Sequence, residues 1–127
     1  MNHEEAVIKA FIRSNRQERF LRFLSDPKRR GEFTSSLAHF KGLNHKYVLR
    51  IPANQQKPSS LANLLASMGA GSKCWVISEN LDVDGREMDL HTALAKTIGY
   101  GMGTIISCVP GRLAYFEDED VRYILSR

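Results

Sequence analysis

The sequence predicts an α+β fold with three short N-terminal helices, followed by a sheet of about five strands with two further helices packed on it. Two observations predict this class. Apolar residues recur at helical spacing in the first 40 residues, whereas short β-prone runs predominate later. Three such runs lie in the last quarter of the chain and are separated by turn residues, which indicates an antiparallel meander. We therefore expect a mixed or antiparallel sheet that is covered on one face.

The first 40 residues predict three helices because a single continuous helix would point its apolar residues to opposite sides. The apolar residues between Val7 and Phe11 share one side, and those between Phe20 and Leu24 would face away from it. A second helix is therefore expected to begin at Ser14 or Asn15, each of which is followed three residues later by a capping partner. Asp26-Pro27 combines a capping residue with a proline at the first helical position, so it is expected to open the third helix.

The middle of the chain predicts one strand and one helix. Residues from His45 to Ile51 include the alternation that is typical of a strand, and Pro52 ends the run, which favours a position at or near an edge of the sheet. Pro58 and the two serines after it are typical of a helix start, and Gly69 is typical of a helix end.

The remaining residues predict a hairpin, a helix and the meander. Residues 73–78 form a β-prone run, and the pair Asp84-Gly85 predicts a two-residue hairpin turn that would fold Leu81 back toward Met88. Asp89 is expected to cap a helix that Gly99 ends. Strands are then expected over residues 104–109, 113–116 and 121–125, joined by a Pro-Gly turn at 110–111 and an acidic turn at 117–120.

Length and composition predict a single domain over residues 1–127, with a helical basic part (1–44) and a mixed part (45–127). A chain of 127 residues that is 43% hydrophobic and 25% charged matches ordinary globular proteins and needs no disulfide or metal. The first residues are acidic rather than basic and apolar, so we expect no secretory signal, no membrane association and a cytoplasmic location. Cys74 and Cys108 are expected to be buried free thiols, although their reactivity is left open.

Charge is distributed unevenly along the chain. Residues 1–50 carry eleven Lys and Arg against five Asp and Glu, whereas residues 51–127 carry seven against nine. Seven cations within residues 13–30 are the candidate partner-binding residues: Arg13, Arg16, Arg19, Arg22, Lys28, Arg29 and Arg30. A basic surface of this kind can bind an acidic protein or the phosphates of a nucleic acid. The arginines from 13 to 22 recur every third residue and so spiral around a helix, which disfavours nucleic acid.

A second group of candidate ligand residues consists of Glu79, Asp82, Asp84, His91 and Gly101. Carboxylates that converge can hold Mg²⁺ or a transition metal and so activate a water molecule. Residues 80–85 also match the first half of a calcium loop, but His91 stands where that loop requires a glutamate. The glycines at 99–103 follow a helix rather than precede one, which is typical of a helix exit and not of a phosphate-binding loop. A solvated turn explains these acids equally well, so neither a metal nor a cofactor is expected.

The function expected from the sequence is a non-catalytic binding or regulatory module that meets an acidic protein partner through its basic N-terminal helices. An enzyme is not favoured, because the sequence contains no Ser-His-Asp order, Walker loop or zinc-ligand spacing. Two alternatives stay open, which are nucleic-acid binding through residues 13–30 and metal-dependent hydrolysis through the acidic segment 79–91. Residues 117–120 are expected to be a solvated turn, which could dock on the basic helices of a second copy and form a homo-oligomer.

Overall fold

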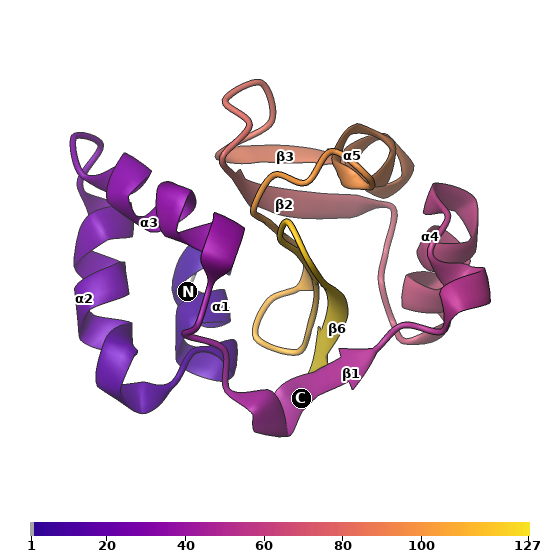
Figure 1. The fold of residues 1–127 in the computed structure, drawn as a ribbon, viewed down its shortest axis with the longest axis horizontal. Coiled ribbons are helices and arrows are strands. Elements are labelled where there is room, and N and C mark those ends of the chain that lie inside the picture. The colour runs from indigo at the N-terminus through magenta and orange to yellow at the C-terminus, as the bar shows by residue number, and fades with distance from the viewer. Residues whose placement is uncertain (1) are drawn as a thin grey trace.

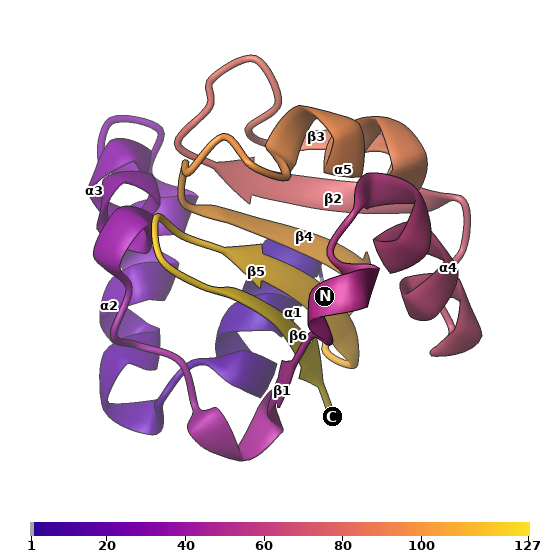
Figure 2. The ribbon, with the colours of Figure 1, turned by 45° about the vertical axis from the view of Figure 1, so that its right-hand side comes forward.

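The computed structural model describes residues 2–127 and places an antiparallel sheet between two layers of helices (Figure 1, Figure 2). Within these residues the α-helices are α1 (His3–Phe11), α2 (Ser14–Ser25), α3 (Arg30–Ser36), α4 (Pro58–Ser67) and α5 (Leu90–Thr97). The strands are β1 (Val48–Arg50), β2 (Lys73–Ser78), β3 (Arg86–Asp89), β4 (Thr104–Val109), β5 (Leu113–Glu117) and β6 (Arg122–Ser126). Short 3₁₀ helices lie at η1 (Leu37–His39), η2 (His45–Tyr47) and η3 (Ala53–Gln55). The predicted α+β class is confirmed.

The strand order in the sheet is β1-β6-β5-β4-β2-β3, so that β5 and β4 are central and β1 and β3 form the edges. The edge position expected for the strand before Pro52 is therefore confirmed, although the strand is shorter than expected. Its first half forms η2 instead, where the side chain of Asn44 accepts a hydrogen bond from the backbone N–H of Lys46 at 3.2 Å. No helix within residues 2–127 is both long and apolar enough to cross a bilayer.

Helices α1, α2 and α3 cover one face of the sheet (Figure 2). The break between α1 and α2 falls where the change of apolar face predicts it, and α2 begins at Ser14. Gln17 does not complete a capping box, because its side chain donates to the carbonyl of Ile12 at 2.9 Å and closes the end of α1. The third helix begins at Arg30 rather than after Asp26, since residues 27–29 form a turn in which the N–H groups of Arg29 and Arg30 both donate to the carbonyl of Asp26.

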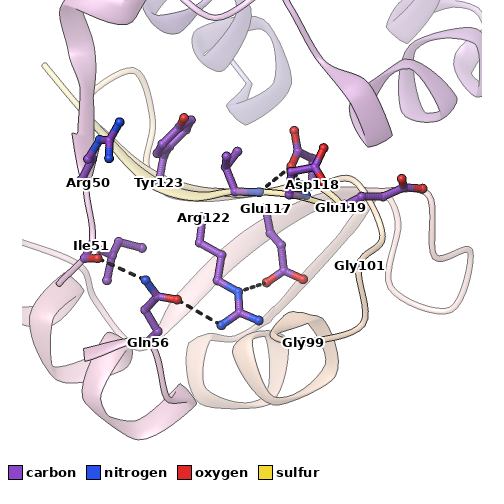
Figure 3. A pocket seen from close by; sticks show the side chains of 12 residues that line it. Arg50, Ile51, Gln56, Gly99, Gly101, Glu117, Asp118, Glu119, Arg122 and Tyr123 are labelled. Atoms are coloured by element: carbon purple, nitrogen blue, oxygen red, sulfur yellow. Dashed lines mark hydrogen bonds and ion pairs between the residues drawn. The ribbon is translucent and has the colours of Figure 1, made fainter. Parts of the chain in front are cut away.

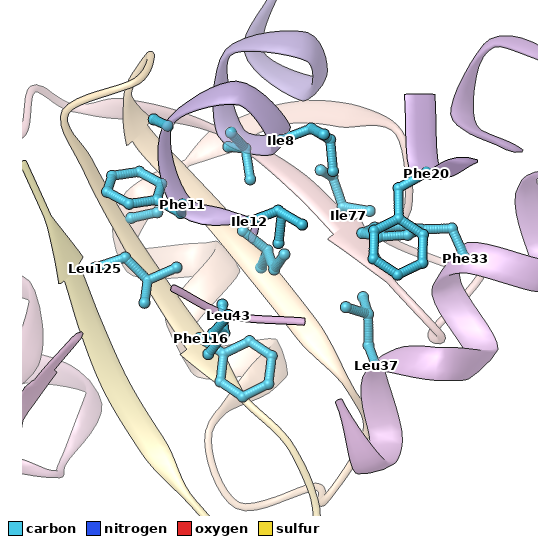
Figure 4. Close-up of a cluster of buried hydrophobic side chains, with 14 of the residues drawn as sticks. Ile8, Phe11, Ile12, Phe20, Phe33, Leu37, Leu43, Ile77, Phe116 and Leu125 are labelled. Carbon is cyan, nitrogen blue, oxygen red and sulfur yellow. The ribbon is translucent and has the colours of Figure 1, made fainter. Parts of the chain in front are cut away.

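The core beneath these helices contains aliphatic and aromatic side chains from every element of the layer (Figure 4). Phe11 and Ile8 of α1 share this core with Phe116 of β5, and Phe33 packs edge to face against Phe20 with ring centroids 5.0 Å apart. Burying side chains of this size stabilises the fold by about 1.5–3 kcal/mol each. This burial fixes the N-terminal layer against the sheet.

Helices α4 and α5 cover the opposite face, so the expectation that only one face is covered is wrong. Leu61 and Leu65 of α4 and Leu94 of α5 pack against Tyr115 and Ile124 of the sheet. Pro58 occupies the first turn of α4, and Asp89 caps α5 by accepting from the N–H of Thr92 at 3.2 Å, as the sequence predicts. β4 and β5 are therefore buried on both faces, and such strands need apolar residues at successive positions. This burial explains the short continuous apolar runs of the two strands.

The predicted two-residue turn at Asp84-Gly85 is wrong. Pairing between β2 and β3 stops at Val76 and Arg86, so the connection runs over residues 77–85 without a ladder to β3. The Asp84 carboxylate draws this loop inward, where it accepts from the backbone N–H of Ser78 at 2.9 Å. Leu81 does not fold back toward Met88 and is 83% exposed.

Gly103 is the residue at which the loop after α5 passes closest to the N-terminal layer. A Cβ atom at this position would overlap the backbone of Leu37 in η1. Gly103 also exchanges two hydrogen bonds with Glu79, whose carboxylate accepts from its N–H at 2.6 Å and whose N–H donates to its carbonyl at 3.0 Å. The loop that bears Gly99 and Gly101 is thereby held in place.

We expect Gly103→Ala to destabilise the protein by roughly 1–3 kcal/mol, because a backbone contact cannot give way without moving η1. Urea denaturation measures the change in the free energy of unfolding. Gly71→Ala is the matched control, since a Cβ there meets open space, and its effect should stay within about 0.5 kcal/mol. Equal stability of the two variants would contradict the close packing at Gly103.

Candidate functional site

One candidate partner-binding residue, Arg30, is turned into the protein. Its guanidinium donates to both oxygens of Asp84, at 2.7 and 3.0 Å, and to both oxygens of Glu4, at 2.7 and 2.6 Å. The three side chains are only 21%, 11% and 15% exposed for Arg30, Asp84 and Glu4. Hydrogen bonds to Asp84 and to Glu4 raise the pKa of Arg30, so it stays charged. Arg30 joins α1, α3 and the loop before β3, and it is not part of an open basic surface.

Four of the other candidate cations gather around Phe23 together with Lys41, and they form a surface that we name the basic face: Arg16, Arg19, Arg22, Arg29 and Lys41. Two hollows of about 430 and 280 Å³ adjoin there and share Arg19 and Phe23 in their walls. The guanidinium groups of Arg19 and Arg29 lie 5.4 and 4.7 Å from the centre of the Phe23 ring. Cations from three separate segments therefore surround one aromatic floor.

The charges of the basic face are only partly balanced within the chain. Arg22 pairs with Glu18 at 2.6 Å and Arg29 pairs with Glu32 at 2.8 Å, but both pairs are exposed and hold little energy. Among residues 2–127, Arg16, Arg19 and Lys41 form no ion pair with an acid. Of the remaining sequence-predicted cations, Arg13 and Lys28 are exposed but line neither hollow.

The candidate ligand residues between 79 and 101 do not form one site, because their side chains have different partners. Glu79 accepts from the N–H of Gly103, Asp84 binds Arg30, and Asp82 and His91 are exposed. No group of three or more potential metal-ligating side chains occurs in the described part of the chain. Gly101 alone of these five residues lines a pocket, and that pocket is built around a different acid.

Neither cysteine is activated. Cys74 and Cys108 are buried free thiols, as expected from the sequence. Burial raises the pKa of both thiols to about 12, and the nearby Asp89 and Glu87 contribute to the rise at Cys74. At neutral pH both remain protonated and are poor nucleophiles.

The acid that the sequence did not single out is Glu117. It is the last residue of the central strand β5, it is 1% exposed, and the expectation of a solvated turn at 117–120 is therefore wrong for this residue. Glu117 shares a face of the sheet with Tyr115 and is directly opposite Arg122 on β6. Figure 3 shows Glu117, Arg122 and Gln56 beside one another in a pocket of about 510 Å³.

The two oxygens of Glu117 are in different environments. Oε1 accepts from the hydroxyl of Tyr115 at 2.8 Å and lies 3.4 Å from Nε of Arg122. Oε2 is buried and has no hydrogen-bond partner among residues 2–127. Burial raises the pKa of Glu117, and the Tyr115 hydroxyl, Arg122 and the backbone N–H groups of Gly99 and Gly101 act against that rise. Burial also raises the pKa of Tyr115, which keeps its hydroxyl protonated and able to donate.

Comparison with known proteins gives no further assignment, because no family model, curated protein or solved structure matches this chain.

Replacing Arg30 by alanine should destabilise the protein by about 3 kcal/mol. The change leaves the carboxylates of Glu4 and Asp84 largely buried without their cation, which costs more than the loss of one favourable pair. Thermal and urea denaturation measure the free energy of unfolding of both variants. The control Lys28→Ala removes an exposed cation from the turn before Arg30 and should lower this free energy by no more than about 0.5 kcal/mol. Similar losses in the two variants would contradict a structural role for Arg30.

Glu117→Gln should become more stable relative to the wild type as pH rises above the ordinary glutamate value of 4.5. As pH rises, the unfolded chain loses its Glu117 proton before the folded chain does. Between the two pKa values of Glu117, ionisation therefore favours unfolding of the wild type by up to about 1.4 kcal/mol per pH unit. Glutamine does not titrate. Urea denaturation from about pH 4 to about pH 8 measures the difference. A difference in stability that does not change with pH would contradict burial of the charge.

Proposed function

We propose that this protein is a non-catalytic binding module that meets an acidic protein partner through the basic face. The observation that carries the proposal is the convergence of cations around Phe23 from α2, from the turn before α3 and from the segment after η1. Five Lys and Arg residues stand there against Glu18 and Glu32, so an excess of three positive charges borders the two hollows. A surface of this kind steers and selects an acidic partner.

The shape of the basic face favours a protein over a nucleic acid. Phe23 lies in the wall of both hollows, and Phe20 and the half-buried Phe40 line the smaller one, so an apolar side chain of a partner has some aromatic surface to contact. The cations surround these hollows and do not follow a single ridge along which a phosphate backbone would lie. An acidic segment with an apolar residue at its centre fits both features.

An acidic turn limits where the partner can lie. Glu119 approaches Nε2 of His39 at 3.3 Å, and its N–H reaches the carbonyl of Ala38 at 3.5 Å, so this turn borders the basic face beside η1. Acids of the partner would be repelled at this end. We therefore expect the partner to contact Arg16, Arg19 and Arg29 more closely than the His39 end of the surface.

The double variant Arg16→Glu, Arg19→Glu should weaken partner binding at least about tenfold. It reverses the charge of two residues that form no ion pair within residues 2–127 and are therefore available to a partner's acids. Immobilised full-length chain is used to recover partners from nuclease-treated extract, and the affinity for the recovered protein is then measured directly. The control Lys57→Glu, Lys96→Glu makes the same change in net charge at exposed residues elsewhere and should bind like the wild type.

Two results would overturn this proposal. Equal binding by the wild type, the reversed variant and the control would show that the basic face is not the interface. Recovery from untreated extract but not from nuclease-treated extract, with affinity falling steeply between about 50 and 200 mM salt, would favour the alternative of nucleic-acid binding.

A further inference from the structure

The pocket at Glu117 lies where three distant parts of the chain meet. The residues after β5 form one wall, Gln56 at the end of η3 forms another, and Gly99 and Gly101 pass along a third (Figure 3). Both glycines have positive φ angles, of 88° and 67°, which lets the backbone turn sharply beside the carboxylate. The volume of about 510 Å³ is within the range of small-molecule sites.

The floor of the pocket contains an acceptor that the chain itself does not use. Oε2 of Glu117 is buried, and no group in residues 2–127 completes a hydrogen bond to it, whereas Oε1 accepts from the Tyr115 hydroxyl. The backbone N–H groups of Gly99 and Gly101 lie near enough to oppose the rise in the pKa of Glu117, but neither satisfies Oε2. Folded proteins satisfy nearly all buried polar atoms, and each exception calls for a missing partner. When Glu117 is ionised its oxygens can only accept, so the missing partner must carry an N–H or O–H group.

The charge of the lining selects among possible donors. The lining residues include four acids, Glu117 and those at 118–120, against Arg50 and Arg122. Asp118 accepts from the backbone N–H groups of Asp120 and Val121, and Glu119 lies 3.3 Å from His39, so these two carboxylates act on the pocket through their charge and not as open acceptors. Arg122 is already engaged, because Nε lies 3.4 Å from Glu117 and Nη1 donates to the side-chain oxygen of Gln56 at 3.3 Å. Gln56 is itself held by donating to the carbonyl of Ile51 at 3.2 Å. The surplus of negative charge favours a cation over an anion.

We propose that this pocket binds a small organic cation whose N–H group donates a hydrogen bond to Oε2 of Glu117. An ammonium or a guanidinium supplies both the donor and the charge that the floor lacks. A metal ion fits less well, because the described residues offer no cluster of three ligands. The same chemistry can come from a free amine or guanidine compound, or from a Lys or Arg side chain of another protein. The site shares no residue with the basic face, so either proposal can fail alone.

Calorimetric titration of the full chain tests the proposal with named probes. Agmatine and putrescine represent free cations, the tripeptide Gly-Arg-Gly represents a protein side chain, and glutarate is the anionic probe. We expect the cations to bind and glutarate not to bind. Tighter binding of agmatine or putrescine would assign a free ligand, and tighter binding of the tripeptide would assign a protein side chain.

Glu117→Gln should weaken cation binding at least about tenfold. The NH2 group that takes the place of Oε2 is itself a donor and repels an N–H group of the ligand. The matched control Glu87→Gln makes the same change at an exposed residue outside the pocket and should change the affinity by less than about threefold. Should Glu117→Gln fold poorly, the wild-type chain still decides the matter, since agmatine must shift the backbone amide resonances of Gly99 and Gly101. Unshifted resonances, equal binding by Glu117→Gln, or preferential binding of glutarate would overturn the proposal.

Discussion

The two-sided burial of β5 is the constraint on which the rest of the structure depends. All five residues from Leu113 to Glu117 are buried, and alternate side chains enter different cores. Ala114 and Phe116 join the core beneath the N-terminal helices, whereas Leu113 and Tyr115 join the core beneath α4 and α5. Because Glu117 continues this alternation, its carboxylate is carried to the α4–α5 side of the sheet. The Tyr115 hydroxyl and Glu117 Oε1 then satisfy one another, and Oε2 is left buried without a partner at the floor of the pocket.

Arg30 is the centre of the polar network on the other side of the sheet. A guanidinium has five donors in a planar fork, so one side chain can bind the carboxylates of Glu4 and Asp84 together, which a lysine could not do in the same geometry. Glu4 also accepts from the indole N–H of Trp75 at 2.8 Å, and this bond extends the network to β2. The network orders the loop before β3 and withdraws a cation from the surface. The basic face is consequently smaller than the charge run in the sequence, and it gains Lys41 from a different segment.

The sequence predicts those features whose causes are local. The break after α1, the starts of α4 at Pro58 and of α5 after Asp89, and the turn at Pro110-Gly111 depend on neighbouring residues, and each is confirmed. The loop before β3 was mispredicted because Arg30, which binds Asp84 from 54 positions away, overrides the local turn preference. Glu117 was missed because it begins a run of four acids, which is typical of a solvated turn. Its one local signal is the spacing of two from Tyr115 within an otherwise apolar strand.

The fold converts a charge difference along the sequence into two surfaces of opposite sign that meet at the His39–Glu119 pair. These surfaces differ in their exposure to solvent ions. The cations of the basic face lie in water, where salt screens interactions beyond about 8–10 Å. The Glu117 side chain is only 2% exposed, so an ion pair made there is screened much less. Partner binding as we propose it at the basic face should therefore weaken with salt, whereas the cation that we propose on Glu117 would be held mainly by a short contact inside the protein. The salt dependence of binding therefore separates the two proposals.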